Sequence, residues 1–528
     1  MISSGNITKN EHSSLRNFSN IFNILSVSFI VIQAFFLILN WNNYPTEIDT
    51  PFHLLMGKMF ADKGQICFWD SYEFAPMGRP NLYPPLLHIL IWFLHALTHF
   101  SYLVVGKIIV IAQSIAGLCI LWIFSKKFFD EKIAFFTIVF FCSNTEAWWW
   151  QTSVAPAVLI TVLFLPFIYA YYKKRIIIST ILLTAFFYLH YGLSFVLAAC
   201  VFLASAFSSL ERKKYLENFF IITAMSFVLF LPWALHVVQY AHYFSDSLRK
   251  FTMLFFFPSK ILWPQIVLNL NVLSWVFVVP GIVGVAKRLR QDFKYALFFA
   301  SFLIFFIFLF FYRGIRFSAH APVVNSVIAA LGFCMAWSCS KALKSRIAKI
   351  FLRGALAFLI SFSVLFEFHF VTPGLLKGAD VKPEVFDLSP TEIAFRPTPL
   401  FNEMMSLLYK IPLRGKDLVA IQYIFNSKRA HLLIDYLRTH FDKNTIIHID
   451  NAEVADYITL TTEIKTDTGM FWETITPELI KERNERRKAG FYISHHKDFH
   501  NLLSPEDLRQ GKYPKIIQVI EKIYIGTL

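Results

Sequence analysis

Charged residues are scarce in this chain. Only 16% of its 528 residues are Asp, Glu, Lys or Arg, whereas 56% are hydrophobic and 60 are Phe. A chain of this composition cannot cover a water-facing surface, which excludes a soluble enzyme, a disordered scaffold and a peripheral protein. The sequence is therefore predicted to be that of an integral membrane protein.

Cysteine is scarce as well, and several familiar motifs are missing. All six Cys precede residue 371, and five of them sit within apolar runs, where Cys acts as a small core residue. No phosphate loop, dinucleotide fingerprint or zinc-protease motif occurs, which argues against a nucleotide-driven transporter or a metalloprotease. The first apolar run lacks a small-residue cleavage site, so we expect a membrane span that stays attached.

Positive charge is present in excess, and its position is informative. The net charge is +15, yet residues 371–528 hold 21 basic and 21 acidic residues, so the whole excess lies in the hydrophobic part. Basic residues between apolar runs mark cytoplasmic loops. The charge therefore predicts membrane topology and gives no reason to expect a nucleic-acid partner.

The apolar runs are long enough to cross a bilayer about eleven times, since one crossing takes about 20 residues. The predicted spans are 21–40, 102–124, 130–148, 153–172, 176–190, 193–209, 217–239, 264–286, 293–312, 318–338 and 349–370. The apolar stretch 84–100 is interpreted as an outer-surface or re-entrant helix, because counting it as a span would invert every later loop.

The basic clusters test this topology. With a cytoplasmic N-terminus, all five clusters fall on the cytoplasmic side. They are Lys126-Lys127, Lys173–Arg175, Arg212–Lys214, Lys287–Arg290 and the run from Lys341 to Lys349. The chain is then a multi-pass protein of the cell membrane, with residues 41–101, the loop 240–263 and the C-terminal domain on the extracytoplasmic side.

The composition changes at Val371, where a linker dotted with Pro begins. Beyond it, the helix-period segment 427–441 alternates with β-rich runs at 445–449 and 490–493, which predicts an α/β domain. The predicted organisation is a transmembrane domain at 1–370 with a large first outer loop at 41–101, a linker at 371–399 and an extracytoplasmic α/β domain at 400–528.

The first outer loop carries acids directly after a span, in the sequence Glu47-Ile48-Asp49-Thr50-Pro51-Phe52-His53. Asp49 and His53 are four residues apart, so one helical turn can aim both at a common point. Asp49 can also act simply as the N-cap of a helix whose first residues include Pro51. Acids at this depth are costly without a role, which favours function.

Two further segments of the loop complete a pattern, Phe68-Trp69-Asp70 and Gly78-Arg79-Pro80-Asn81-Leu82-Tyr83-Pro84-Pro85-Leu86-Leu87-His88. Together with the segment from Glu47 to His53, they resemble the first outer loop of the catalytic subunit of oligosaccharyltransferases, particularly the archaeal and bacterial single-subunit enzymes of the GT-C class. A late segment, Tyr312-Arg313-Gly314-Ile315-Arg316-Phe317, looks like the Arg-Phe motif of those enzymes. The architecture of many spans followed by an outer α/β domain fits as well.

The resemblance implies an enzyme with a GT-C-like helical fold. It would transfer a sugar or oligosaccharide from a polyprenyl-phosphate or -diphosphate donor to a glycan or protein acceptor on the extracytoplasmic face. Asp49 matches the family's first-loop acid, and Glu47 is a second catalytic candidate. Arg316 matches the residue that faces the donor phosphate, and a guanidinium suits a phosphoryl group. Arg313 and Arg316 can alternatively snorkel at a helix end.

The resemblance also implies a divalent cation, Mg²⁺ or Mn²⁺, held by acids of the outer loops. Asp49, His53 and Glu146 are the candidate ligands. The second acidic motif of the family is absent, because the next outer turn reads Trp148-Trp149-Trp150-Gln151-Thr152-Ser153 with only Glu146 nearby. The aromatic motif that recognises a protein sequon is absent too. These departures put protein N-glycosylation in question.

The remaining candidates for substrate binding lie at predicted outer ends: Asp70, Arg79, Tyr83, His88, His190 and His236. For the histidines at the ends of spans, a packing role is the commoner outcome. The alternative function is non-catalytic, a transporter of lipid-linked glycans or an inactive paralogue that serves as a scaffold. Transporters place charges at mid-membrane depth, whereas here the acids gather at the outer surface, which favours the enzyme.

Overall fold

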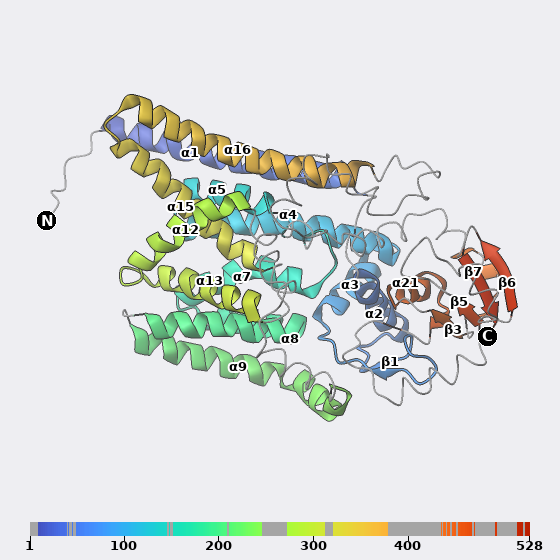
Figure 1. The fold of residues 1–528 in the computed structure, drawn as a ribbon. Coiled ribbons are helices and arrows are strands. Elements are labelled where there is room, and N and C mark those ends of the chain that lie inside the picture. Colours follow the sequence, from blue (N-terminus) through green and yellow to red (C-terminus); the bar gives the residue numbers. More distant parts are fainter. Residues whose placement is uncertain are drawn as a thin grey trace.

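The computed structural model describes most of the helical part and selected segments of the C-terminal part (Figure 1). The described residues are 9–39, 41, 45, 49–144, 147, 151–208, 211–244, 272–311, 320–377, 434–435, 437–439, 441–443, 446–449, 452–466, 469, 491–493, 515–520 and 523–527. Four predicted site residues, Glu47, Glu146, Arg313 and Arg316, lie outside them.

A bundle of long apolar helices forms the main body. Its helices are α1 (Lys9–Leu39), α4 (Tyr102–Phe128), α5 (Glu131–Cys142), α7 (Pro156–Tyr172), α8 (Ile176–Phe207), α9 (Arg212–Gln239), α12 (Val272–Lys287), α13 (Phe293–Phe311), α15 (Ala321–Ala342) and α16 (Arg346–Lys377). Within the described part of the chain, five are long and apolar enough to cross a membrane: α1, α4, α8, α9 and α15. The chain is mostly helical, as predicted, and the count of eleven spans stays a prediction.

Helix α8 covers two predicted spans, 176–190 and 193–209, and bends sharply between them. His190 has non-helical backbone angles, φ −160° and ψ 93°. The rings of Phe187 and Phe195, on either side of the bend, lie 5.2 Å apart. At the far ends, Lys174 forms an ion pair with Glu211. The two legs of α8 therefore run back along each other, which agrees with two antiparallel segments at this point of the sequence.

Most of the basic clusters meet at one end of the bundle. Hydrogen bonds join neighbouring helices there: Lys126 Nζ to Asn23 Oδ1 (3.0 Å), Lys294 Nζ to the Phe128 carbonyl (3.0 Å) and the Tyr172 hydroxyl to Asp292 Oδ2 (3.3 Å). The clusters at 126–127, 173–175, 212–214 and 287–290 adjoin these contacts or the Lys174–Glu211 pair. This arrangement agrees with the predicted alternation of the helices.

The outward faces of the outer helices are apolar. On α9, the side chains of Val228 and Val238 are 66% and 69% exposed, and on α1 that of Leu39 is 67% exposed. Exposed apolar faces of this length suit a hydrocarbon environment and not water. Together with the apolar helices, they support a multi-pass membrane protein.

The segment predicted as the first outer loop, for which we keep that name, forms a compact layer at the other end of the bundle. It contains α2 (Thr50–Lys63), β1 (Trp69–Asp70), β2 (Arg79–Pro80) and α3 (Leu86–Thr98). The strands pair antiparallel, with Asp70 opposite Arg79. Helix α3 lies in the stretch predicted as an outer-surface or re-entrant helix, and it crosses α2 closely where Gly57 faces Ile91, because a side chain at Gly57 would overlap Ile91.

The C-terminal segments form a mixed five-stranded sheet and a helix. The strands are β3 (Ile446–Ile449), β4 (Lys465–Thr466), β5 (Phe491–Ile493), β6 (Lys515–Ile520) and β7 (Ile523–Thr527), in the order β4-β3-β5-β7-β6. β3 runs parallel to β4 and β5, and β7 is antiparallel to β5 and β6. Helix α21 (Ala452–Thr462) lies between β3 and β4 in the chain. Strands β3 and β5 fall where β-rich runs predicted them, whereas the domain limits at 370 and 400 stay predictions.

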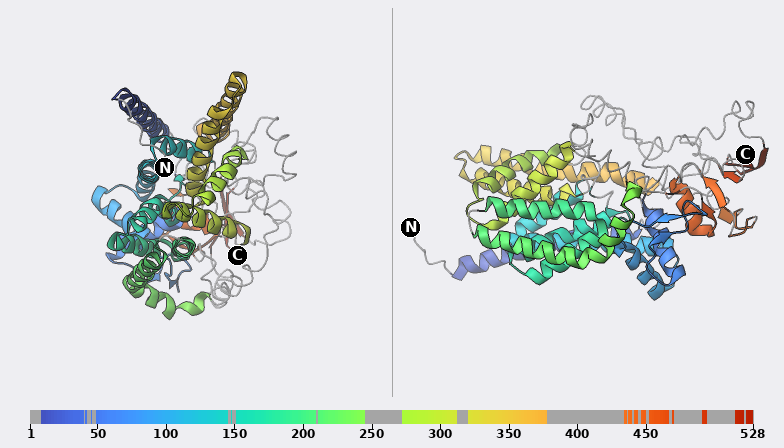
Figure 2. Two further views of the ribbon diagram at one scale, coloured as in Figure 1. Left: turned by 90° about the vertical axis from the view of Figure 1, so that its left-hand side faces the viewer. Right: turned by 90° about the horizontal axis from the view of Figure 1, so that it is seen from below.

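The C-terminal elements lie on the first outer loop, at the end of the bundle away from the start of α1 (Figure 1 and Figure 2). Helix α21 packs against α2. Two backbone hydrogen bonds join β4 to the loop, from Ala75 N to the Thr466 carbonyl (2.9 Å) and from Thr466 N to the Tyr72 carbonyl (3.4 Å). Segments almost four hundred residues apart thus form one layer.

Candidate active site

Asp49 stands at the N-terminus of α2, as the sequence predicted. The helix begins at Thr50 with Pro51 in its first turn, and the side chain of Asp49 makes no capping hydrogen bond. The first turn is closed instead by the backbone, because His53 N donates to the Asp49 carbonyl at 3.2 Å. The capping interpretation of the Asp49 carboxylate is therefore not supported.

The start of α2 is tied to the next outer turn of the bundle. Val154 N donates to Thr50 Oγ1 at 3.2 Å. The same turn is held from α4, where Ser114 Oγ donates to the Gln151 carbonyl at 2.8 Å and Gln113 Nε2 donates to it at 3.1 Å. Asp49 is therefore placed beside the turn at 151–154, a segment that carries no acid in this chain.

His53 and His88 form a buried pair between α2 and α3. His53 Nδ1 lies 3.0 Å from His88 Nε2, and the two residues are 1% and 0% exposed. Burial lowers the pKa of His53 well below its usual value, and the charges of His88 and His190 lower it further. Burial alone lowers the pKa of His88 to about 3. Both rings are therefore neutral near pH 7, and one proton lies between the two nitrogens.

Tyr83 brings the histidine pair together with His190. Its ring centroid is 5.0 Å from that of His53, 5.8 Å from that of His88 and 6.3 Å from that of His190. His190 reaches this place because the bend of α8 occurs at that residue. We call His53, Tyr83, His88 and His190 the histidine–tyrosine group.

Asn81 fixes the backbone just before Tyr83. Its Nδ2 donates to the Cys67 carbonyl at 3.1 Å, and its Oδ1 accepts from Tyr83 N at 3.3 Å. His236, on α9, is 2.9 Å through Nε2 from the Asn81 carbonyl. His236 therefore contacts the loop backbone and packs with Phe68, at a ring distance of 4.8 Å, which is the packing role that is common for such histidines.

Asp70 and Arg79 belong to a separate buried cluster, which also contains Glu73 and Asp456. Arg79 forms an ion pair with Glu73, and its Nε lies 3.7 Å from Asp70 Oδ2. Asp70 Oδ1 also accepts from Tyr72 N at 3.0 Å, which turns the backbone towards Glu73. Asp456 joins the cluster from α21, where Glu73, Arg79 and Asp70 all act on it electrostatically. We call these four residues the carboxyl cluster.

The structure thus places the predicted substrate-binding residues in three positions. Tyr83, His88 and His190 come together beside α2, Asp70 and Arg79 lie in the carboxyl cluster, and His236 contacts the loop backbone. Their substrate-binding role stays a prediction. The positions of Glu47, Glu146, Arg313 and Arg316 lie outside the described residues. Their roles in catalysis, donor binding and metal binding stay predictions.

The described residues do not by themselves assemble a metal site. No group of three or more His, Cys, Asp and Glu side chains among them is arranged to hold a metal ion. Asp49 contributes one carboxylate, and the Nδ1 of His53 faces another imidazole at 3.0 Å. A divalent cation at Asp49 would therefore need ligands from the rest of the chain.

The sequence analysis did not predict a role for two residues of the carboxyl cluster, Glu73 and Asp456. Glu73 has a local signal, since it follows Asp70 by three residues and precedes Arg79 by six. The signal for Asp456 is a single acid in the run Val454-Ala455-Asp456-Tyr457-Ile458-Thr459-Leu460. Residues 455–460 are all buried, so this acid lies inside the structure.

Comparisons with known proteins identify the class of fold. No protein-family model matches the chain, and no curated protein matches it in sequence. Among solved structures, ArnT from Cupriavidus metallidurans bound to undecaprenyl phosphate superposes with a TM-score of 0.57 and 10% identity, covering 95% of this chain and 97% of that one. The archaeal oligosaccharyltransferase AglB from Archaeoglobus fulgidus, in complex with an inhibitory peptide and a dolichol-phosphate, gives 0.56 and 12%, covering 89% and 69%.

The fold is that of GT-C glycosyltransferases. The resemblance drawn from the first outer loop is thereby confirmed at the level of fold. At 10–12% identity, the likeness does not assign a donor, an acceptor or a residue role.

Proposed function

We propose that this chain is a membrane glycosyltransferase that moves a sugar or oligosaccharide from a polyprenyl-phosphate or -diphosphate donor to a glycan or protein acceptor on the extracytoplasmic face. The observation that carries the proposal is the position of Asp49. Its carboxylate stands at the N-terminus of α2 without a capping role, at the end of a GT-C-like bundle opposite the basic clusters.

The proposed reaction uses Asp49 as the base. An acceptor hydroxyl or amide attacks the anomeric carbon of the donor sugar and loses its proton to the Asp49 carboxylate. The bond between that carbon and the phosphate oxygen breaks, and the phosphate leaves with the electron pair. Arg316 is proposed to stabilise the leaving group, because a guanidinium holds phosphoryl oxygens through two parallel hydrogen bonds. Glu47 and Arg313 are proposed to assist at the same place.

The histidine–tyrosine group is proposed to line the donor side of the site. Neutral imidazoles and a phenol offer hydrogen bonds without bringing charge into a buried place. ArnT and AglB, which share the fold, were solved with undecaprenyl phosphate and a dolichol-phosphate. These ligands support a polyprenyl donor here.

The test must separate an enzyme from a carrier of lipid-linked glycans. Lipid-linked sugars are extracted from cells that lack the gene, in which an unused donor accumulates. They are supplied to the purified protein together with the glycans and proteins of the same cells, which contain the unmodified acceptor. We expect release of free polyprenyl phosphate or diphosphate, because transfer breaks the sugar–phosphate bond. A protein that binds the donor and leaves it intact would contradict the proposal and support the carrier.

Binding of a short-chain polyprenyl phosphate tests the role of Arg316, with the polyprenyl alcohol of equal length as a control for the lipid tail. Arg316→Lys keeps the charge and loses the paired geometry, so we expect donor affinity to fall about ten- to a hundredfold. Arg316→Ala should lose more, and Arg313→Ala shows whether that residue takes part. Unchanged phosphate affinity in Arg316→Ala would remove Arg316 from the donor site.

A further inference from the structure

Three carboxyl groups lie together where α21 meets the first outer loop, and the Arg79 guanidinium forms ion pairs with two of them, Asp70 and Glu73. Asp456 and Glu73 are 0% exposed, Asp70 is 1% exposed and Arg79 is 3% exposed. If all four were ionised, the cluster would carry a net charge of about −2 away from water, which is very costly. A proton shared between the carboxyls removes part of that cost.

Of the three acids, Asp456 has the surroundings that stabilise a carboxylate least. Both of its carboxyl oxygens are buried, and neither accepts a hydrogen bond from a donor in the described part of the chain. Its carboxyl adjoins that of Glu73, which Arg79 holds from the other side. A neutral Asp456 can donate its own proton to the Glu73 carboxylate, and this satisfies both groups.

The electrostatic environment points the same way. Burial raises the pKa of Asp456 well above its usual value, and the neighbouring Glu73 raises it further, against the opposing effect of Arg79. Burial and Glu73 also raise the pKa of Asp70. An acid with a raised pKa stabilises the docked arrangement fully below the pKa that it has when exposed, and this stabilisation is lost as the pH rises through the raised value.

Close contacts between the first outer loop and the C-terminal segment cover the carboxyl cluster. Gly469 packs against Glu73 so tightly that a side chain at this glycine would overlap the Glu73 carboxyl. The hydrogen bonds between Ala75, Tyr72 and Thr466 run alongside it. Separating α21 and β4 from the loop would therefore expose the cluster to water.

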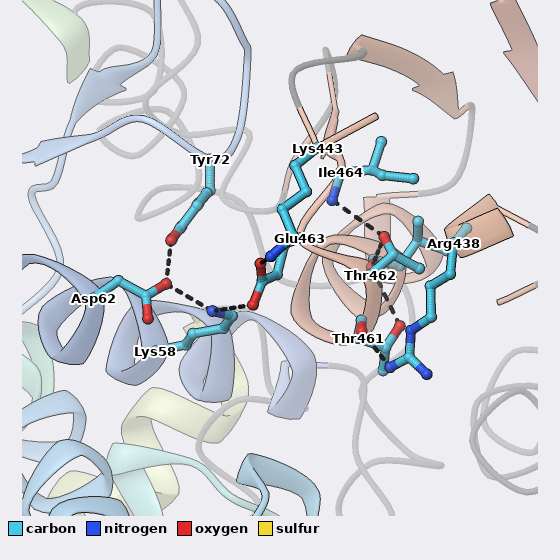
Figure 3. A network of polar contacts seen from close by, with 10 residues as sticks. Lys58, Asp62, Tyr72, Arg438, Lys443, Thr461, Thr462, Glu463 and Ile464 are labelled. Carbon is cyan, nitrogen blue, oxygen red and sulfur yellow. Dashed lines mark hydrogen bonds and ion pairs between the residues drawn. The ribbon is translucent and has the colours of Figure 1, made fainter. Parts of the chain in front are cut away.

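A second set of charges, which we call the rim charges, lies at the same interface, with Lys58 buried and Glu463 and Lys443 exposed (Figure 3). Lys58 Nζ lies 2.6 Å from Asp62 and 3.4 Å from Glu463, which also forms an ion pair with Lys443. The Tyr72 hydroxyl donates to Asp62. Hydrogen bonding to Lys443 lowers the pKa of Glu463, so the contribution of Glu463 is present above its ordinary pKa and is lost as the pH falls.

We infer that α21 and β4 are held on the first outer loop by a proton shared among Asp456, Glu73 and Asp70, and that removal of this proton releases them. The inference goes beyond the proposed function, and its tests need no substrate.

Distance measurements between two spin labels test the release directly. The labels are placed at Met77→Cys and Asp435→Cys, both exposed positions, in a Cys339→Ser background that removes an exposed thiol. We expect one short distance in mildly acidic buffer and a growing population of longer distances as the pH rises. The ratio of released to docked protein should grow about tenfold for each pH unit while one proton is lost.

Two matched variants separate the shared proton from the rim charges. Asp456→Asn is always neutral and can still donate to Glu73, so it should stay docked at the pH at which the unsubstituted protein opens. Glu463→Gln removes an acid at the rim, so it should weaken docking near neutral pH and leave in place the opening that follows loss of the shared proton. If Asp456→Asn opened with the same pH profile as the unsubstituted protein, the inference would be wrong.

Infrared spectroscopy of the unsubstituted protein supplies a test that does not depend on any variant folding. A protonated carboxyl has a C=O stretching band distinct from that of a carboxylate. We expect such a band at the pH at which the spin labels show docked protein, and we expect it to disappear over the same pH range in which the labels move apart. Absence of the band from the docked protein would overturn the inference.

Discussion

The Nδ1 atom of His53 and the Nε2 atom of His88 lie 3.0 Å apart, although 35 residues separate them in the sequence. The contact joins α2, which follows Asp49, to α3, which lies in the stretch that the sequence predicts as an outer-surface or re-entrant helix. It orients the two helices that frame the proposed site. Its pH dependence can be derived from the burial of both rings.

Acid should destabilise the protein through this pair. Because burial lowers the pKa of both histidines, the unfolded chain binds protons below about pH 6.5 that the folded chain does not bind. The loss approaches about 1.4 kcal/mol per pH unit for each histidine. His88→Gln cannot titrate, so its thermal midpoint should fall less than that of the unsubstituted protein between about pH 7 and about pH 5. His242→Gln, at an exposed position, is the control and should keep the full pH dependence.

Removing the charge of Asp49 should stop transfer and leave the fold intact. Asp49→Asn keeps the size of the side chain, and no capping hydrogen bond is lost. We expect a fall in turnover of about a hundred- to ten-thousandfold with an unchanged thermal midpoint. Asp62→Asn, in the same helix, is the matched control and should retain activity. Binding of Mn²⁺ by the two variants tests the predicted cation separately, since only Asp49→Asn should weaken it.

Two glycines of the first outer loop offer a paired test of its packing. Gly64 and Gly78 have nearly the same φ, 65° and 66°, but a side chain at Gly64 would meet no atom within 4 Å, whereas one at Gly78 would overlap the Asp70 carbonyl. Gly64→Ala should cost about 1–2 kcal/mol for the backbone conformation. Gly78→Ala should cost about 1–3 kcal/mol more, because the strand pair must move apart. Equal thermal midpoints for the two variants would contradict the described turn.

The predicted sidedness can be tested with an impermeant thiol reagent in intact cells, again in the Cys339→Ser background. Thr445→Cys should react directly, because the C-terminal part is predicted to be extracytoplasmic. Lys213→Cys, whose parent side chain is 92% exposed at the basic end of the bundle, should react only after permeabilisation. The opposite pattern would mean that the number of spans is wrong by one.

Local pattern was sufficient to predict part of this structure. The spacing of Asp49, Pro51 and His53 predicted the start of α2, and the hydrophobic runs separated by basic clusters predicted the alternation of the helices. Two β-rich runs predicted β3 and β5. Each of these features depends on residues that are neighbours in the sequence.

Contacts between distant residues could not be predicted in the same way. The partner of His53 is a histidine on another helix, and nothing in either local sequence specifies the pairing. The predicted substrate-binding role of Asp70 and Arg79 stays a prediction. Their clustering with Asp456, from the far end of the chain, could not be predicted from the sequence of one loop. Single-sequence patterns contain no information about such pairings.

The contact of Lys58 with Glu463 spans 405 residues, and this separation affects how the protein is made. At about 5–20 residues per second, a ribosome needs roughly 20 to 80 seconds to synthesise the chain between them. During that time Glu73, Asp70 and Arg79 have no α21 to cover them, so the first outer loop stays hydrated until nearly the whole protein has been translated. A prematurely ended chain would leave this polar surface exposed, a local defect by which cellular quality control can tell unfinished molecules from complete ones.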